Sequence, residues 1–309
     1  MMRPRWAPLT IVVALATCTY AGPPELQAAN QQAVFRATAN LVAVDATVMR
    51  GRNPVVGLTA ADFVLTDNGI VQQIDSVSQG TMPLDLTIVL DFSVSARNDF
   101  GEFLRSAANM QRLLRPEDRW RWLGIFMEAR EVMSMRPAHD PLPALSRPDV
   151  VNITALHDTV FLALVRPGEP ERRHLVVVFT DGDDTWSMLD GGQLPSIAGK
   201  ADAVLHAVIS GSPAGPQTDG NRMREREDRR WRESQDALFD AVRVSGGSIH
   251  HLSNRAEAFA KIIEDFRSAY VLRYVPKGVD TPGWHEVKVS VNRPGSYAIR
   301  ARKGYEKHQ

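Results

Sequence analysis

The chain has 309 residues, of which 44% are hydrophobic, and it carries 36 basic and 36 acidic side chains. A chain of this length and composition buries a substantial core, and its balanced charge gives no reason to expect a nucleic acid as partner. The single cysteine, Cys18, lies close to the amino terminus. The rest of the chain therefore has neither a disulfide framework nor a thiolate zinc site.

Residues 1–21 have the pattern of an export signal. Two arginines precede an apolar run, Leu9–Thr17, and Thr19-Tyr20-Ala21 offers a small-residue cleavage site. Leu15–Cys18 also resembles a lipobox, which would attach a lipid to Cys18; the remaining alternative is a buried N-terminal helix. No later stretch has the roughly 18 consecutive apolar residues of a transmembrane helix. We expect an exported protein that is periplasmic, secreted or lipid-anchored at the cell envelope.

A small β unit is predicted after this signal. Residues 22–33 are small and polar and are expected to form a flexible leader, and residues 34–82 contain the β pattern. Apolar and polar side chains alternate in this segment, and turn residues separate the alternating runs. The predicted elements are a strand over Leu41–Val48, a short helical turn capped by Thr59, a strand over Phe63–Thr66, a hairpin turn at Asp67-Asn68-Gly69 and a returning strand over Val71–Val77.

Residues 83–269 alternate apolar runs with stretches of helical periodicity, which is typical of an α/β domain with a doubly wound, mostly parallel sheet. The predicted strands are Leu86–Leu90, Trp120–Met127, its antiparallel neighbour Glu131–Met135, His174–Phe179, Ala203–Ile209 and Ser248–Leu252. The predicted helices are Phe100–Leu114, Ala155–Val165, Gly191–Ala201, Asn221–Val244 and Arg255–Tyr270.

The pattern returns to β structure in residues 270–309. The predicted strands are Tyr270–Val275, His285–Asn292 and Tyr297–Arg302. Neither this segment nor residues 34–82 is large enough to stand alone. We therefore expect the two segments to pair, so that the α/β domain is inserted between two halves of one small β domain.

Two predicted parallel strands end in oxygen-bearing side chains. Asp91, Ser93 and Ser95 follow the strand Leu86–Leu90, and Asp181 follows the strand His174–Phe179. Ligands of doubly wound sheets bind at the carboxyl ends of the strands, and Thr154, at the start of a predicted helix, adds another hydroxyl. Oxygen ligands of this kind suit Mg²⁺, Mn²⁺ or Ca²⁺. The alternative is that these aspartates and serines are ordinary turn formers.

The order of these residues resembles the metal-ion-dependent adhesion site of von Willebrand factor type A (VWA) domains. The resemblance is carried by Asp91-Phe92-Ser93-Val94-Ser95, by Thr154 and by Thr180-Asp181-Gly182, and it covers about residues 83–266. It implies that Ser93, Ser95 and Thr154 bind the cation through hydroxyls, with Asp91 and Asp181 binding directly or through water. It also implies that an open position on the cation takes a carboxylate oxygen from a protein partner. The flanking segments are similar to those of exported bacterial proteins that carry this domain.

Other polar groups have less specific patterns. Asp183, Asp184 and Trp186 follow Asp181 and are candidates for the rim of the site, although a solvated acidic loop explains the two aspartates as well. His250-His251 is expected to comprise one buried and one exposed imidazole. The sequence contains no phosphate-binding loop and no nucleophile motif.

The sequence therefore predicts a non-enzymatic binding module that engages an acidic residue of a protein partner through a divalent cation. A second hypothesis is a structural component of the cell envelope in which the metal site is vestigial. A third, metal-assisted hydrolysis, lacks a general base.

Overall fold

The computed structural model describes residues 41–93, 107, 109–143, 153–166, 169, 171–210, 222–251 and 255–307. The predicted signal and leader, Val94, Ser95 and most of the predicted helix Phe100–Leu114 lie outside these residues. Among the described residues, no helix has both the length and the hydrophobicity needed to cross a membrane.

The central sheet has six strands in the order β11-β10-β9-β6-β7-β8. Neighbouring strands are parallel except for β8, which is antiparallel to β7. Strands β6, β9 and β10 are buried along their whole length, which explains their continuous apolar runs. The bounds are β6 Leu84–Asp91, β7 Arg119–Ile125, β8 Ala129–Pro137, β9 Arg173–Thr180, β10 Ala203–Ile209 and β11 Ile249–His251.

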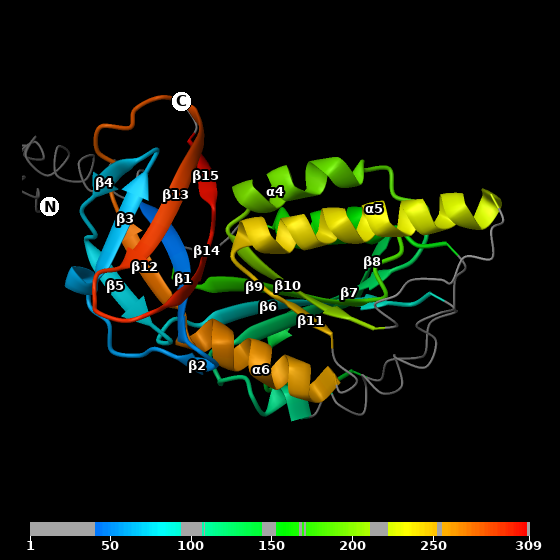
Figure 1. Cartoon of the computed structure of the whole chain (residues 1–309). Coiled ribbons are helices and arrows are strands. Elements are labelled where there is room, and N and C mark those ends of the chain that lie inside the picture. Colours follow the sequence, from blue (N-terminus) through cyan, green and yellow to red (C-terminus); the bar gives the residue numbers. More distant parts are fainter. Residues whose placement is uncertain are drawn as a thin grey trace, which may run out of the picture. The chain divides into compact units, whose positions relative to one another are not determined.

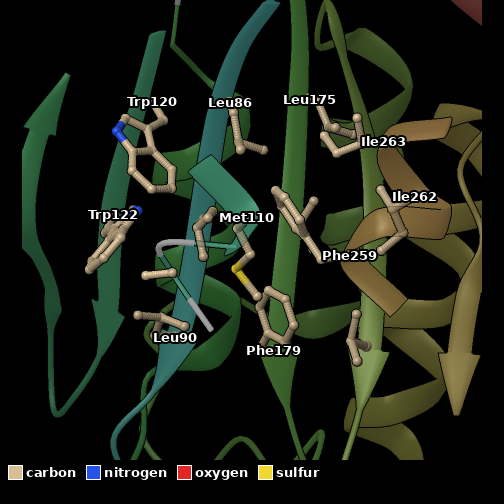
Figure 2. Close-up of a cluster of buried hydrophobic side chains, with 14 of the residues drawn as sticks. Leu86, Leu90, Met110, Trp120, Trp122, Leu175, Phe179, Phe259, Ile262 and Ile263 are labelled. Atoms are coloured by element: carbon tan, nitrogen blue, oxygen red, sulfur yellow. The ribbon is translucent and has the colours of Figure 1, made fainter. Parts of the chain in front are cut away.

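Helices cover both faces of this sheet (Figure 1). One face packs against apolar side chains of α3, α4 and α5, and the other packs against α6 and Met110. Figure 2 shows the second of these cores, in which Trp120 and Trp122 lie across from Phe259 and Ile262 of α6. The doubly wound α/β fold is therefore confirmed. The bounds are α3 Leu156–Leu164, η2 Gly191–Gln193, α4 Leu194–Lys200, α5 Arg222–Ser245 and α6 Arg255–Ser268.

The small flanking β domain is built from both chain segments, as the sequence predicts. Strand β1 pairs with β12 and β14, and β3 pairs with β13, so that the segment before the central sheet and the segment after it share two sheets. Their strand orders are β14-β1-β12-β5, with β2 beside β1, and β15-β13-β3-β4. The bounds are β1 Val42–Arg50, β2 Asn53–Pro54, η1 Ala60–Asp62, β3 Phe63–Asp67, β4 Ile70–Gln72, β5 Ser76–Gln79, β12 Tyr270–Tyr274, β13 Gly283–Val291, β14 Ala298–Ala301 and β15 Gly304–Lys307.

Two local predictions, one in this domain and one at its border with the central domain, are wrong. The segment Val71–Val77 is not one strand, because β4 stays beside β3 while β5 pairs with β12 in the other sheet. The change of sheet is held by Gln72, whose side-chain amide donates to the carbonyl of Lys277 at 3.0 Å and accepts from its N–H at 2.8 Å. The predicted last helix also ends at Ser268 rather than at Tyr270, because Tyr270 begins β12.

Candidate metal site

Asp91 is the last residue of β6 and is only 5% exposed. One of its carboxylate oxygens accepts the backbone N–H of Ser93 at 2.8 Å, and the other accepts the hydroxyl of Thr180 at 2.7 Å. Since Thr180 ends β9, this second bond joins the carboxyl ends of two neighbouring parallel strands. The ends of β6 and β9, which the sequence predicts to lie together, are therefore joined by a direct hydrogen bond.

The charged form of the Asp91 carboxylate is electrostatically disfavoured by its surroundings. Burial and the nearby charge of Asp181 raise its pKa from 3.8 to about 6, although hydrogen bonds from Ser93 and Thr180 oppose this shift. Burial disfavours a charged carboxyl group, and a second carboxylate adds repulsion. A cation between these two groups would relieve both effects.

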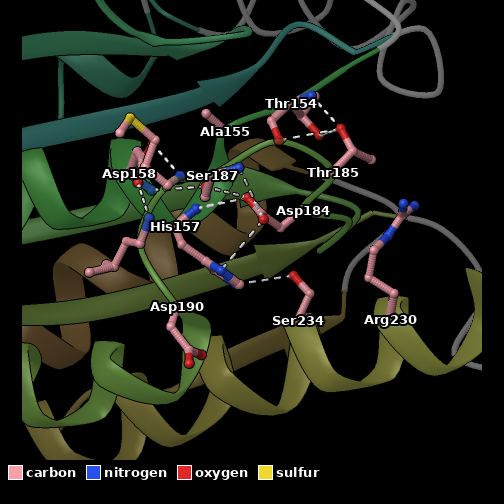
Figure 3. A network of polar contacts seen from close by, with 12 residues as sticks. Thr154, Ala155, His157, Asp158, Asp184, Thr185, Ser187, Asp190, Arg230 and Ser234 are labelled. Atoms are coloured by element: carbon pink, nitrogen blue, oxygen red, sulfur yellow. Dashed lines mark hydrogen bonds and ion pairs between the residues drawn. The ribbon is translucent and has the colours of Figure 1, made fainter.

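Thr154 precedes α3 and is tied to the loop that follows β9. Its carbonyl accepts the N–H groups of Thr185 at 2.9 Å and Trp186 at 3.0 Å, and its own N–H donates to the Thr185 hydroxyl at 2.7 Å. Figure 3 shows Thr154 facing Thr185 at this edge of the sheet. The Thr154 hydroxyl donates to the carbonyl of Asp183 at 3.0 Å, which leaves oxygen lone pairs for another ligand.

The loop after β9 is held from its other side by α5. Gln235 donates to the carbonyl of Asp181 at 2.8 Å, and Ser234 donates to the carbonyl of Gly182 at 2.9 Å. Gly182 has a φ of +87°, and a Cβ at this position would lie 2.6 Å from the Gln235 side chain. This close approach requires glycine, so the backbone that carries Asp181 is fixed against the helix.

Asp184 is not part of a solvated acidic loop, which was one of the two interpretations of its sequence context. Its side chain is 12% exposed, and it accepts the backbone N–H of His157 at 3.2 Å and the hydroxyl of Ser187. His157 Nε2 in turn lies 3.1 Å from the hydroxyl of Ser234 (Figure 3). Asp184 therefore fastens the loop to the first turn of α3.

Ser234, His157 and Asp184 have the residue types of a hydrolase triad, but the geometry gives them a structural role. Ser234 is 4% exposed and its hydroxyl donates to the Gly182 carbonyl, so the oxygen cannot reach a substrate. The imidazole Nδ1 of His157 lies 3.6 Å from Asp184, outside good hydrogen-bonding distance. Sequence reasoning missed both His157 and Ser234 because nothing in the helical pattern marks them.

The remaining rim candidates differ in exposure. Trp186 is 57% exposed beside Thr154. Asp183 lies 3.5 Å from Arg230 of α5, and burial raises the pKa of Asp183 even though Arg230 lowers it.

His250 is buried and His251 is exposed, as expected from the sequence. Ser95, the second serine of the motif, lies outside the described residues.

No protein-family model and no curated protein matches the chain. Among solved structures, it is similar to an aerotolerance-related membrane protein from Bacteroides fragilis, with 16% identity, a TM-score of 0.41, and coverage of 59% of this chain and 98% of that one. It is similar to the ArnB paralog VWA2 from Sulfolobus acidocaldarius, with 10% identity, a TM-score of 0.45, and coverage of 87% and 76%. It is also similar to proximal thread matrix protein 1 from the mussel byssus with a zinc-occupied MIDAS motif, with 13% identity, a TM-score of 0.46, and coverage of 63% and 48%.

The sheet and the order of the motif residues define the fold of the central domain. Strands β6 and β9 are adjacent and parallel, and they bring Asp91 and the loop of Asp181 to one edge. Thr154 contacts this loop at the carbonyl of Asp183. The central domain has a doubly wound α/β fold that is consistent with a VWA/Rossmann-like fold. Within this domain, the described motif residues are on the two strand ends and the helix start that the sequence predicts.

The oxygen donors at this edge of the central domain fit a hard divalent cation. Carboxylate and hydroxyl oxygens are the ligands that Mg²⁺, Mn²⁺ and Ca²⁺ prefer. The described residues contain no group of three or more His, Cys, Asp or Glu side chains that could hold a metal ion. A cation at this edge would therefore need hydroxyl oxygens as well as carboxylates.

Proposed function

We propose that the VWA domain is a binding module that engages an acidic residue of a protein partner through a divalent cation. Asp91, Ser93, Ser95, Thr154 and Asp181 would hold the cation. The bound cation would supply an electrophilic position for a carboxylate oxygen of the partner. Mg²⁺ is the first ion to test, followed by Mn²⁺ and Ca²⁺, and zinc is included because the mussel protein is described with zinc in this motif.

One observation carries this proposal: the buried Asp91 carboxylate contacts the end of the neighbouring strand through Thr180, close to a second carboxylate, Asp181. Among the residues that the structure describes, neither carboxylate forms an ion pair with a basic side chain, and two such carboxylates at a strand edge oppose folding. Arg230 contacts Asp183 rather than either of them. A cation bound by the oxygens of Asp91 and Asp181 would balance their negative charges.

Export to the cell envelope is part of the proposal, and it rests on the amino-terminal signal pattern. The module is proposed to be non-enzymatic, since the Ser234 hydroxyl is buried and engaged in a hydrogen bond. The alternative function is a structural or assembly component of the envelope, in which the β domain makes the contacts and the metal site is vestigial.

A peptide array tests the proposed function directly. Pairs of peptides that differ only in Glu against Gln are probed with the full chain in Mg²⁺ and in EDTA. We expect a subset of Glu peptides to bind in Mg²⁺, to lose binding in EDTA and to lose binding to the Asp181→Ala variant, because the carboxylate must complete the coordination of the cation.

Asp240→Ala is the matched control for this array. Asp240 is an aspartate of α5 whose side chain is 52% exposed, and the substitution should leave binding unchanged. Equal binding of Glu and Gln peptides, or binding that is insensitive to EDTA, would favour the structural component over the cation-dependent module.

A further inference from the structure

Two exposed apolar side chains lie on the loop that follows β9, beside the candidate cation site. Trp186 is 57% exposed and Met188 is 96% exposed. The backbone N–H of Trp186 donates to the carbonyl of Thr154, a proposed cation ligand, at 3.0 Å. From Trp186 to Asp190, exposed residues alternate with partly buried ones. Large apolar side chains in such a place are informative, because folding normally buries them.

Polar contacts hold this loop in place from its inner side. The carboxylate of Asp158 accepts the backbone N–H of Met188 at 2.9 Å. The hydroxyl of Ser187 accepts the backbone N–H of Asp158 at 3.1 Å and donates to Asp184 (Figure 3). Because the loop is already held in the folded protein, a partner that covers Trp186 and Met188 would not bear the cost of ordering it.

The turn between β7 and β8 brings a third exposed apolar side chain, Met127, to the same edge of the sheet. Met127 is 52% exposed. The carbonyl of the preceding residue, Phe126, accepts the backbone N–H of Ala155 at 2.6 Å, and the Phe126 ring stacks on that of Phe92 with centroids 4.7 Å apart. Phe92 and Ala155 each directly follow a proposed cation ligand. Met127 is therefore next to a residue with two contacts at the site.

The loop and the turn lie on opposite sides of one peptide group. The carbonyl of Thr154 accepts from Trp186, whereas the N–H of the next residue, Ala155, donates to Phe126. The described chain contains no cis peptide bond, and the C=O and N–H of a trans peptide point in opposite directions. The segments that carry the exposed apolar side chains therefore flank the residue whose hydroxyl is proposed to bind the cation.

We propose that Met127, Trp186 and Met188, the apolar rim, contact a partner segment in which a large apolar residue (Phe, Leu or Met) stands next to the acidic residue. This inference rests on the proposed function, because the acidic residue would reach the rim by binding the cation. Burial of large apolar side chains around a central anchor is a main source of affinity in protein interfaces. The cation would require the acid, and the apolar rim would select its neighbours.

Charged side chains next to the apolar rim favour a peptide segment over a membrane. Glu128 directly follows Met127 and its side chain is 73% exposed. Asp190 is exposed two residues after Met188. Insertion of the rim into a lipid bilayer would bury these charges at high cost, whereas individual side chains of a peptide fit between them.

Peptide binding to the full chain tests the apolar rim. Glu peptides that bind in Mg²⁺ are compared with versions in which the large apolar neighbour of the glutamate is replaced by serine. We expect this replacement to weaken binding to the wild type by about tenfold or more. Trp186→Ser should bind the apolar peptide about tenfold more weakly and should no longer distinguish it from the serine version. Met188→Ser should change binding in the same direction.

Two controls separate contact with the partner from support of the fold. Val71→Ser removes an apolar side chain of β4 that is 67% exposed in another sheet, and it should leave peptide binding unchanged. Calorimetric titration of Mg²⁺ into Trp186→Ser should give the affinity of the wild type. A purely structural tryptophan would instead weaken Mg²⁺ and peptide binding together, which would overturn the inference.

The outcomes also separate the apolar rim from the proposed function. Mg²⁺-dependent binding of Glu peptides that is indifferent to their neighbouring residue and to Trp186→Ser would overturn the rim and leave the proposed function standing. If no Glu peptide binds in Mg²⁺, both fail. Co-sedimentation of the wild type with phosphatidylcholine vesicles in EDTA, lost in Trp186→Ser, would assign the rim to a membrane and overturn the inference.

Discussion

Asp91→Asn is expected to stabilise the protein in EDTA and to abolish its stabilisation by Mg²⁺. The folded-state pKa of about 6 against an ordinary 3.8 means that the charged form of Asp91 costs roughly 3 kcal/mol of folding free energy at neutral pH. Asparagine removes this charge but keeps only one acceptor oxygen for Ser93 and Thr180. We therefore expect a net gain of about 1 kcal/mol, or about 2–4 °C in melting temperature.

The pH dependence has a defined sign. Because the pKa of Asp91 is raised in the folded state, the folded protein binds more protons than the unfolded chain between pH 3.8 and about 6. This group therefore contributes a loss of stability as the pH rises through that range. Differential scanning calorimetry in EDTA should show that this loss is smaller in Asp91→Asn, while the exposed control Asp240→Asn behaves as the wild type. A lower melting temperature of Asp91→Asn in EDTA would contradict this electrostatic picture.

Asp67→Ala is expected to destabilise the small β domain by about 3–5 kcal/mol. Asp67 of β3 is fully buried and accepts the hydroxyls of Tyr274 at 2.9 Å and Tyr305 at 2.8 Å, and it lies 2.8 Å from Nδ1 of His285. Truncation would leave two buried groups, of Tyr274 and His285, and the partly buried hydroxyl of Tyr305 without their shared partner, which is among the costliest single changes in a core. Urea unfolding followed by tryptophan fluorescence measures the loss.

Tyr305→Phe is the graded control for this network. It removes one hydroxyl while Tyr274 and His285 continue to satisfy Asp67, so a cost of about 1 kcal/mol is expected. Burial and the neighbouring Asp67 hold the pKa of both phenols above the ordinary value, so both stay protonated donors. A loss of less than 1 kcal/mol for Asp67→Ala would mean that this carboxylate does not join the strands of the two chain segments.

The strands of the central sheet could be predicted because their residues are buried on both faces. Leu86–Leu90 and His174–Phe179 are apolar except for Thr87 and His174, and the polar residues after them mark the sheet edge where Asp91 and Asp181 lie. The position of Thr154 followed from the start of the next helix. Periodicity and the chemistry of strand ends were sufficient for these features.

The supports of the candidate site could not be predicted, because they depend on contacts between distant segments. Ser234 and Gln235 belong to a helix whose sequence is dominated by charges, yet they hold the carbonyls of Gly182 and Asp181. The sequence around Asp184 suggests an acidic loop, because it does not show that the backbone N–H of His157 donates to this carboxylate. The division of Val71–Val77 between two sheets likewise depends on Lys277, about 200 residues later in the chain.

Calorimetric titration of Mg²⁺ into the EDTA-treated and dialysed full chain tests the central claim most directly. The buried Asp91 and its neighbour Asp181 predict one binding site in the wild type and in Asp240→Asn, and none in Asp91→Asn or Asp181→Ala. Identical titration curves for the wild type and Asp91→Asn would contradict the assignment of the metal site.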